Sequence, residues 1–306
     1  MFPVISVDNT KAEVMLEPLG TKRKFWFHDD KGRQMLFKAE ERGTGEDWAE
    51  KIACELCKLL GLPHVHYDLA EEVEGKTPGV VCETCAKPPL ALVLGNQLLL
   101  DHDPAYPVID ARRYKVRQHT VEAVTEIVQT LQPPPSDYTA SLPDGIATAL
   151  DVFVGYIMLD AWIANQDRHH ENWAALREGE QFFLAPSFDH GASMARNISD
   201  TEREKRLTTR DVNFRVAAFA RRAKSAFYRA DGPDKTITTV EAWRLFSRKS
   251  PQSAIMWKQR LEAIDEQSVD HLLGQVPTTR LSSVGRDFTR QLLCENRRRL
   301  LEGDEP

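Results

Sequence analysis

The first part of the chain alternates polar and apolar residues in short segments, as β-strands do. Two such segments, 24–27 and 33–40, flank the polar, glycine-containing segment 28–32, and this pattern predicts a β-hairpin. A short apolar run at 80–82 follows a Thr-Pro-Gly turn sequence and predicts a buried strand. We therefore expect a small strand-rich unit, which we place at residues 1–86.

A helix is predicted inside this unit. Apolar residues recur at helical spacing from Trp48 to Leu60, and Gly61 follows where a helix would end. Thr44, with Asp47 three residues later, resembles the capping box that begins many helices. We therefore expect the helix to begin just after Thr44.

Helical periodicity dominates the remainder of the chain. Segments 120–131 and 145–164 predict two helices, and the second is apolar on most faces. Several amphipathic helices are predicted between residues 212 and 301. The expected fold class is α+β and bilobal, with a small strand-rich N-lobe and a larger helical C-lobe at residues 87–306.

The composition is that of an ordinary folded protein. Of 306 residues, 42% are hydrophobic and 28% are charged, and a formal charge of -6 argues against a surface adapted as a whole to nucleic acid or anionic membrane. The N-terminus has no secretory pattern, and Asp151 and Asp160 interrupt the longest apolar stretch, so no membrane span is predicted. Five cysteines favour a reducing compartment, and we expect a cytoplasmic protein.

Residues that suit phosphoryl transfer follow the long apolar helix. Asp167 and Asn172 are five residues apart, and Asp189 comes 22 residues after Asp167, behind an apolar run and ahead of Gly191. A short hairpin can bring Asp189 back beside Asn172. Phosphoryl transfer needs one carboxylate that accepts the proton of the attacking hydroxyl, while an Asn and a second Asp are hard oxygen ligands for Mg²⁺. The pattern therefore predicts a kinase site.

These residues resemble a known family. Residues 159–169 with Asn172, and residues 184–186 with Asp189, are similar to the HipA-like Ser/Thr kinases of bacteria, whose catalytic lobe looks like that of eukaryotic protein kinases and phosphoinositide kinases. The resemblance implies a protein-kinase-like fold that uses ATP and Mg²⁺. It further implies that Asp167 is the catalytic aspartate and that Asn172 and Asp189 bind the metal.

The residues after Asp167 depart from the family pattern. Arg168, His169 and His170 replace small residues and lean toward phosphoinositide kinases. The acceptor is therefore expected to be a Ser or Thr of a protein substrate, with a small molecule or phosphoinositide as the alternative. Adjacent histidines do not easily reach one metal ion together, so we expect His169 to orient other groups.

The predicted N-lobe holds the other residues that a kinase needs. A kinase uses a lysine on a strand ahead of a helix with an internal glutamate, and the two form an ion pair that holds the lysine on the phosphates. Lys38 lies among apolar neighbours in its predicted strand. Glu50 and Glu55 lie on opposite flanks of the apolar stripe, so periodicity leaves both open. The family spacing to Gly61 selects Glu50.

Two further nucleotide contacts are expected. The segment 19–24 precedes the hairpin, where a loop over the phosphates is needed, and its candidates are Gly20 and Thr21. The resemblance implies that Glu83 and Cys85 belong to a hinge that contacts adenine through backbone groups. By analogy with the family, the resemblance also implies that this chain is a toxin controlled by an antitoxin partner.

Zinc is the alternative to this interpretation. Four cysteines in two C-x-x-C pairs, with two nearby histidines, have the composition of a zinc site: Cys54, Cys57, Cys82, Cys85, His64 and His66. The first pair falls inside a predicted helix, whereas zinc-binding cysteines usually come from turns. We therefore expect small buried side chains, with a zinc-stapled, non-enzymatic interaction module as the alternative.

A basic segment stands out in an acidic protein. Between Arg203 and Arg229 there are nine basic and two acidic residues. Arg215, Arg222 and Arg229 are one heptad apart and would share a helix face. This predicts a docking surface for an acidic partner, with a solvated helix face as the alternative.

Overall fold

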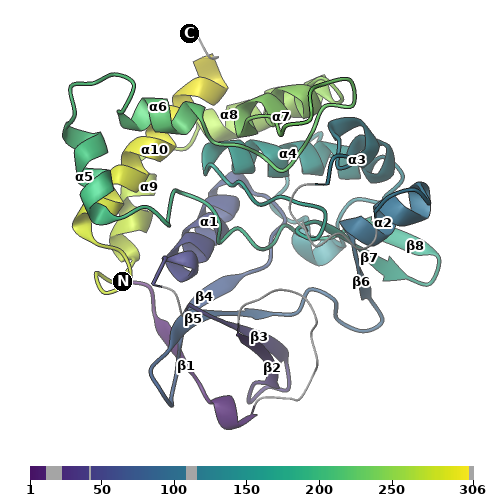
Figure 1. The fold of residues 1–306 in the computed structure, drawn as a ribbon. Helices are drawn as coiled ribbons and strands as arrows, with labels where there is room; N and C mark the ends of the chain where they lie inside the picture. Colours follow the sequence, from purple (N-terminus) through teal and green to yellow (C-terminus); the bar gives the residue numbers. More distant parts are fainter. Residues whose placement is uncertain (12–22, 41–42, 108–115, 303–306) are drawn as a thin grey trace.

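The architecture has a strand-rich part and a helical part, with one helix between them (Figure 1). The structure is a computed structural model that describes residues 1–11, 23–40, 43–107 and 116–302. The mixed α and β composition and the division into a strand-rich and a helical part confirm the predicted fold class. No helix within the described residues is long and apolar enough to cross a membrane.

A five-stranded sheet forms the strand-rich part. Its strands are β1 (Val4–Val7), β2 (Lys24–His28), β3 (Gln34–Ala39), β4 (Tyr67–Glu72) and β5 (Pro78–Glu83), in the order β1-β4-β5-β3-β2. β1 is parallel to β4, and the other pairs are antiparallel. The predicted hairpin is confirmed, because β2 and β3 pair with Lys24 opposite Lys38. The predicted strand at 80–82 is confirmed as β5.

The helix α1 (Glu46–Leu60) confirms the predicted helix, and Gly61 ends it. The predicted cap is wrong: Gly45, with φ 78°, is the N-cap residue. The carboxylate of Glu40 instead accepts hydrogen bonds from the backbone amides of Thr44 at 3.2 Å and Glu46 at 2.6 Å. A carboxylate just after β3 therefore satisfies backbone donors at the start of the helix, where the capping box was predicted.

The helical part carries a second, three-stranded sheet. Its strands are β6 (Ala91–Leu94), β7 (Ala174–Glu178) and β8 (Gln181–Leu184), in that order. The helices are α2 (Gly95–His102), α3 (Val121–Val128), α4 (Ala149–Trp162), α5 (Asp200–Thr208), α6 (Val216–Arg221), α7 (Thr239–Ser247), α8 (Pro251–Glu262), α9 (Glu266–Gln275) and α10 (Ser283–Glu302). Both predicted helices are confirmed, as α3 and α4. Thr148 and Asp151 form a capping box that begins α4 later than predicted.

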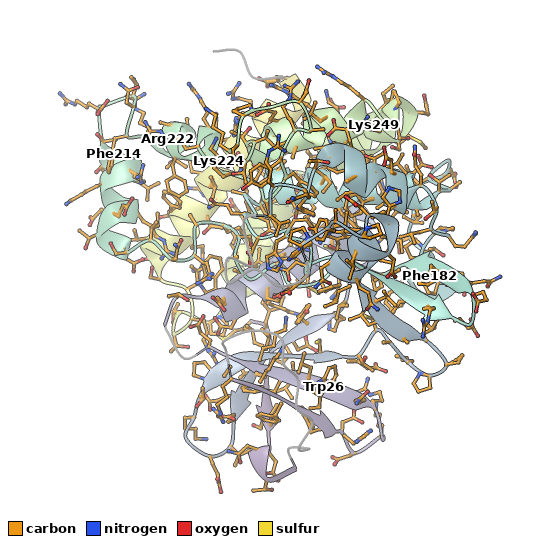
Figure 2. The ribbon with its side chains drawn as sticks, turned by 45° about the vertical axis from the view of Figure 1, so that its right-hand side comes forward. Trp26, Phe182, Phe214, Arg222, Lys224 and Lys249 are labelled. Carbon is orange, nitrogen blue, oxygen red and sulfur yellow. The ribbon has the colours of Figure 1, made fainter. Side chains whose placement is uncertain are left out.

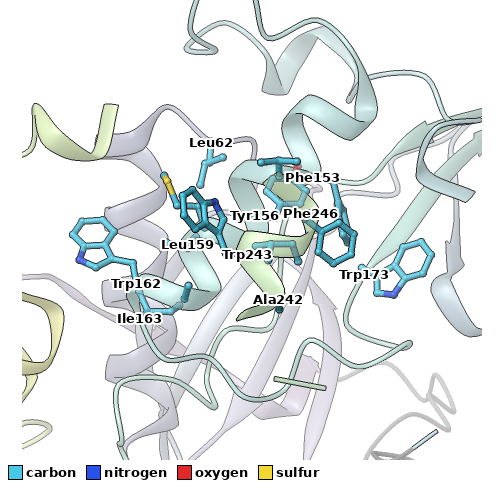
Figure 3. Packing of buried hydrophobic residues seen from close by; sticks show 14 of the residues in the cluster. Leu62, Phe153, Tyr156, Leu159, Trp162, Ile163, Trp173, Ala242, Trp243 and Phe246 are labelled. Carbon is cyan, nitrogen blue, oxygen red and sulfur yellow. The ribbon is translucent and has the colours of Figure 1, made fainter. Parts of the chain in front are cut away.

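The main core surrounds α4, of which only Asp151 is not buried. Aromatic side chains from α7 and from the segment just before β7 pack there (Figure 3), and the ring centroid of Phe153 lies 5.5 Å from that of Phe246 and 5.9 Å from that of Trp173. The same cluster includes Trp48 and Ile52 of α1. α1 therefore belongs to the core of the helical part as well as covering the sheet.

The basic segment does not form the helix face that its spacing predicts. α6 is short, Arg222 is its C-cap residue, and Arg229 lies in a later non-helical segment. Arg206 pairs with Glu202, and Arg229 lies 3.7 Å from Glu241. Figure 2 shows Arg222 near the outer surface of the helical part, far from the sheet. The heptad spacing fails here because the chain leaves the helix after six residues.

Candidate active site

A cavity of about 510 Å³ gathers the predicted site residues, and this volume is typical of small-ligand sites. Eight of the predicted residues line it: Lys38, Glu50, Glu83, Cys85, Asp167, His169, Asn172 and Asp189. They come from β3, α1, β5 and its following segment, and the loops after α4 and β8. Gly20 and Thr21 lie outside the described residues. The roles of these residues stay predictions, but their placement in one cavity is a finding.

Lys38 and Asp189 form an ion pair across the cavity. The Nζ of Lys38 lies 3.0 Å from the Oδ1 of Asp189. Burial lowers the pKa of Lys38, but the negative charges of Asp189 and Glu50 outweigh it, and the net effect is a pKa above the ordinary value. Lys38 is therefore a cation at neutral pH, paired with Asp189.

Glu50 holds the segment after Asp189. Its carboxylate accepts hydrogen bonds from the backbone amides of His190 at 2.8 Å and Gly191 at 3.0 Å. The expected ion pair between Lys38 and Glu50 is therefore wrong in detail, because Glu50 bonds to these amides while Lys38 bonds to Asp189. Glu55, the alternative, pairs with Lys51 at 2.7 Å on another side of the helix. The structure thus places Glu50 and not Glu55 at the cavity.

The loop after α4 fixes Asp167 and Asn172 to each other. The amide nitrogen Nδ2 of Asn172 donates to the backbone carbonyl of Asp167 at 2.7 Å, and the backbone amide of His169 donates to the same carbonyl at 2.8 Å. Asn172 is buried, and this bond leaves its Oδ1 as the atom that can bind a cation. The loop therefore presents one carboxylate and one amide oxygen from a rigid backbone.

His169 is a buried neutral imidazole next to Asp167. Burial lowers the pKa of His169 to about 4. Its Nδ1 accepts a hydrogen bond from the backbone amide of Glu171 at 3.1 Å, so the proton of the neutral ring is on Nε2. That Nε2 lies 3.7 Å from the Oδ1 of Asp167. The ring is thus oriented with its N–H beside the carboxylate of Asp167.

Arg168 is a buried side chain that holds together the segments around the site, a role that sequence reasoning missed. It is 1% exposed, and its guanidinium binds both oxygens of Asp160 at 2.7 and 2.8 Å. It also donates to the backbone carbonyl of Asn172 and to the Oγ of Ser187, both at 3.0 Å. One buried side chain therefore joins α4, the Asp167 loop and the segment before Asp189. The signal in the sequence is Asp160, an acid near the end of a largely apolar helix, followed eight residues later by Arg168.

The hairpin predicted between Asn172 and Asp189 is confirmed as β7 and β8. After it, Asp189 has a backbone φ of 59°, in the left-handed region that is uncommon for a residue with a side chain. His190 is held on both sides, by Ser187 Oγ at 2.7 Å and by the Oε1 of Glu50 at 3.4 Å. Such a conformation persists only where the surroundings hold it, as they do here.

The expected hinge follows β5. Glu83 pairs with Lys87 at 2.7 Å and lies 3.6 Å from Arg33, so its side chain is held by neighbouring cations. Burial raises the pKa of Cys85 to about 11, so its thiol is neutral at physiological pH. Apolar side chains, among them Leu36 and Val80, line the cavity as well. The cavity thus has an apolar surface near the hinge and a charged end at Asp189.

The four-cysteine zinc alternative is not supported. Cys54 and Cys57 belong to different hydrophobic clusters. Within the part of the chain that the structure describes, the group with metal-binding spacing is instead Cys54, His64 and His66. Burial raises the pKa of Cys54, but hydrogen bonds with His64 and His66 outweigh it and lower that pKa to about 6.

Comparisons with known proteins agree with this geometry. No family model and no curated protein matches the sequence. Among solved structures, the proinflammatory kinase CtkA of Helicobacter pylori matches with a TM-score of 0.72 and 17% identity, over 98% of this chain and 96% of that one. The chain has the fold of HipA-like kinases.

A second structure supports this assignment of the HipA-like fold. HipA of Shewanella oneidensis MR-1, solved with HipB and its operator DNA, matches with a TM-score of 0.58 and 12% identity. The match covers 94% of this chain and 65% of HipA, so this chain spans about two thirds of that protein's length. At these identities the likeness shows the fold.

Proposed function

We propose that this HipA-like chain is an ATP- and Mg²⁺-dependent kinase that transfers the γ-phosphoryl group to a Ser or Thr hydroxyl of a protein. The observation that carries the proposal is the charged set at one end of the cavity. Lys38 is ion-paired to Asp189, Glu50 holds the backbone beyond Asp189, and Asp167 lies in the same cavity. This is the set of groups on which protein-kinase chemistry depends.

Asp167 is the proposed catalytic residue. Its carboxylate is partly exposed and lines the cavity, where it would accept the proton of an attacking hydroxyl. The neutral ring of His169 has its N–H beside this carboxylate and would orient it without adding a positive charge. Lys38 would bind the phosphates, and the backbone bonds from Glu50 would keep Asp189 in position.

The donor set fits Mg²⁺. Asn172 offers an amide oxygen and Asp189 a carboxylate, and hard oxygen donors of this kind are what Mg²⁺ binds. When bound there with ATP, the ion would neutralise charge on the phosphates. We assign adenine to the apolar end of the cavity, against the hinge at Glu83 and Cys85, and the phosphates to a loop at Gly20 and Thr21.

The partners follow from the same proposal. HipA was solved with HipB, and we extend an antitoxin-like partner to this cytoplasmic kinase by analogy. The basic segment from Arg203 to Arg229 is the proposed surface for an acidic partner. Arg215 and Arg222 are exposed there. The acceptors of their hydrogen bonds to this segment are neutral backbone carbonyls and not carboxylates.

The test uses the purified chain with Mg²⁺ and ATP labelled on the γ-phosphoryl group, offered separately to protein, lipid and small-molecule fractions. For Asp167→Asn, we expect Mg-ATP to bind within several-fold of the native affinity while transfer falls by roughly 10² to 10⁴. Asp189→Ala should instead lose metal-dependent nucleotide binding, measured by calorimetry. Asp101→Asn, an exposed acid on α2, is the matched control.

Three results would contradict parts of the proposal. Near-normal transfer by the Asp167→Asn variant would show that this loop is not catalytic. Unchanged Mg-ATP affinity in the Asp189→Ala variant would remove the metal assignment. Label that appears in lipid or small molecules but not on Ser or Thr of protein would replace the protein acceptor with the alternative substrate class.

A further inference from the structure

Three ligand-type side chains converge beside α1, one helical turn beyond Glu50 and outside the set of residues that line the cavity. Cys54 lies in α1, His64 in the connection to β4, and His66 immediately before β4. One potential ligand atom from each lies within 4.8 Å of the other two. The cysteine is 1% exposed, whereas the His66 side chain is 51% exposed, so the group reaches from the core to the surface.

One nitrogen of each imidazole is hydrogen-bonded to an oxygen atom. The Nδ1 of His64 lies 2.7 Å from the carbonyl oxygen of Leu62, and the Nε2 of His66 lies 3.2 Å from Oδ2 of Asp68. These oxygens accept hydrogen bonds, so each of these nitrogens carries a proton. The lone pairs of the neutral rings then belong to Nε2 of His64 and Nδ1 of His66. Metal-binding histidines are held in this way by carboxylates and backbone carbonyls.

The spacing between sulfur and nitrogen fits a tetrahedral metal ion. The Sγ of Cys54 lies 3.6 Å from the Nδ1 of His66. Typical bonds of about 2.3 Å from zinc to sulfur and about 2.0–2.1 Å from zinc to nitrogen, at a tetrahedral angle, separate the two ligand atoms by about 3.6 Å. The side chains therefore need little movement to share an ion.

We propose that Cys54, His64 and His66 bind a zinc ion, with solvent as the fourth ligand at the exposed side of His66. One thiolate and two imidazoles are borderline-soft donors that suit zinc better than Mg²⁺ or Ca²⁺. The site is separate from the cavity and needs neither Cys57 nor Cys82. It does not depend on the proposed kinase activity.

Such an ion would fasten the helix that carries Glu50 to residues 64–66, which are hydrogen-bonded to the segment before Asp189. The backbone amide of Val65, between the two histidines, donates to the carbonyl of Ser187 at 2.9 Å. The amide of Ser187 in turn donates to the carbonyl of Pro63 at 3.0 Å. Zinc bound to the folded chain alone would raise its melting temperature by mass action.

The test is metal analysis of the chain prepared without a polyhistidine tag, loaded with zinc and then gel-filtered. We expect one zinc ion per chain in the native protein, and its loss in Cys54→Ser and in His66→Gln. Asp68→Asn, which removes the partner of His66, should weaken zinc binding by roughly 10- to 100-fold. Cobalt in place of zinc should show thiolate-to-metal charge-transfer absorption that is lost in Cys54→Ser. His102→Gln and Cys294→Ser are the controls and should keep the metal.

If Cys54→Ser does not fold, the His66→Gln variant still tests the proposal, because the side chain of His66 is half-exposed. Native protein that retains no zinc after loading would overturn the proposal and leave a hydrogen-bonded cysteine–histidine pair. Zinc that persists in His66→Gln would place the ion elsewhere. Retention of copper(I) with no binding of zinc would contradict the choice of metal.

Discussion

Replacing Arg168 by methionine tests the buried framework under the Asp167 loop. The guanidinium of Arg168 makes two bonds to Asp160 and one each to Asn172 and Ser187, all between 2.7 and 3.0 Å. Methionine has a similar length and can fill the space, but it supplies no donor. The substitution therefore removes the charge and the hydrogen bonds without opening a large cavity.

The expected cost follows from what is left behind. Asp160 is 4% exposed and would keep its bond from the Nδ2 of Asn165 at 2.8 Å but lose its counter-charge. Removing one partner of a buried ion pair costs about 3–5 kcal/mol. We expect Arg168→Met to lower the free energy of unfolding by that amount, measured by denaturant titration with tryptophan fluorescence. The double variant, Asp160→Asn with Arg168→Met, should recover at least ~1 kcal/mol of the lost free energy of unfolding, because no unpaired charge remains.

Arg177→Met, at an exposed position in β7, is the matched control and should change stability little. A loss below about 1 kcal/mol for Arg168→Met would refute the reasoning. So would a double variant whose loss equals the sum of the two single losses, because the two charges would then not be coupled.

Two more predictions concern charge. Glu50→Gln leaves one acceptor for the two backbone amides beyond Asp189 and removes a negative charge near Lys38. Assays with labelled ATP should therefore show phosphoryl transfer reduced roughly 10- to 100-fold in Glu50→Gln and near normal in Glu55→Gln. Burial lowers the pKa of His119 from 6.5 to about 3, so between these values the unfolded state binds a proton that the native state does not. The free energy of unfolding should therefore fall with pH below 6.5, by at most about 1.4 kcal/mol per pH unit, and denaturant titration of His119→Gln should show a shallower fall.

Each of these has a contrary outcome. Equal losses of transfer in Glu50→Gln and Glu55→Gln would mean that the effect is a general one on α1 and not on the segment beyond Asp189. An identical pH dependence in His119→Gln and the native protein would assign the acid sensitivity to other groups. His102→Gln, at an exposed histidine, should keep the native pH dependence.

The sequence was sufficient for the elements and residues whose arrangement is local. β2 and β3 are joined by a short turn, and the β7–β8 hairpin lies between Asn172 and Asp189, so spacing along the chain predicts these neighbours. Lys38 could be selected because a lysine among apolar residues in a strand is uncommon. These signals depend on residues that are close together in the chain.

Contacts between distant residues could not be predicted in the same way. Glu50 binds an amide 140 residues away, and no periodicity within α1 indicates that contact. The Thr44 cap was wrong because Glu40, just after β3, accepts hydrogen bonds from the backbone amides at the start of the helix. Likewise, the C-x-x-C spacing does not indicate that tertiary packing places Cys54 beside His66.

The position of α1 in two cores has a consequence for regulation. Many protein kinases are switched off by displacement of the equivalent helix, which removes its glutamate from the site. Here such a displacement would expose Trp48 and Ile52, which pack with α4, and break the bond between Asp47 and Arg280 at 2.5 Å. We therefore expect the Glu50 end of the site to stay assembled whether or not nucleotide is bound. Control of the site would then act on access to the cavity and not on displacement of this helix.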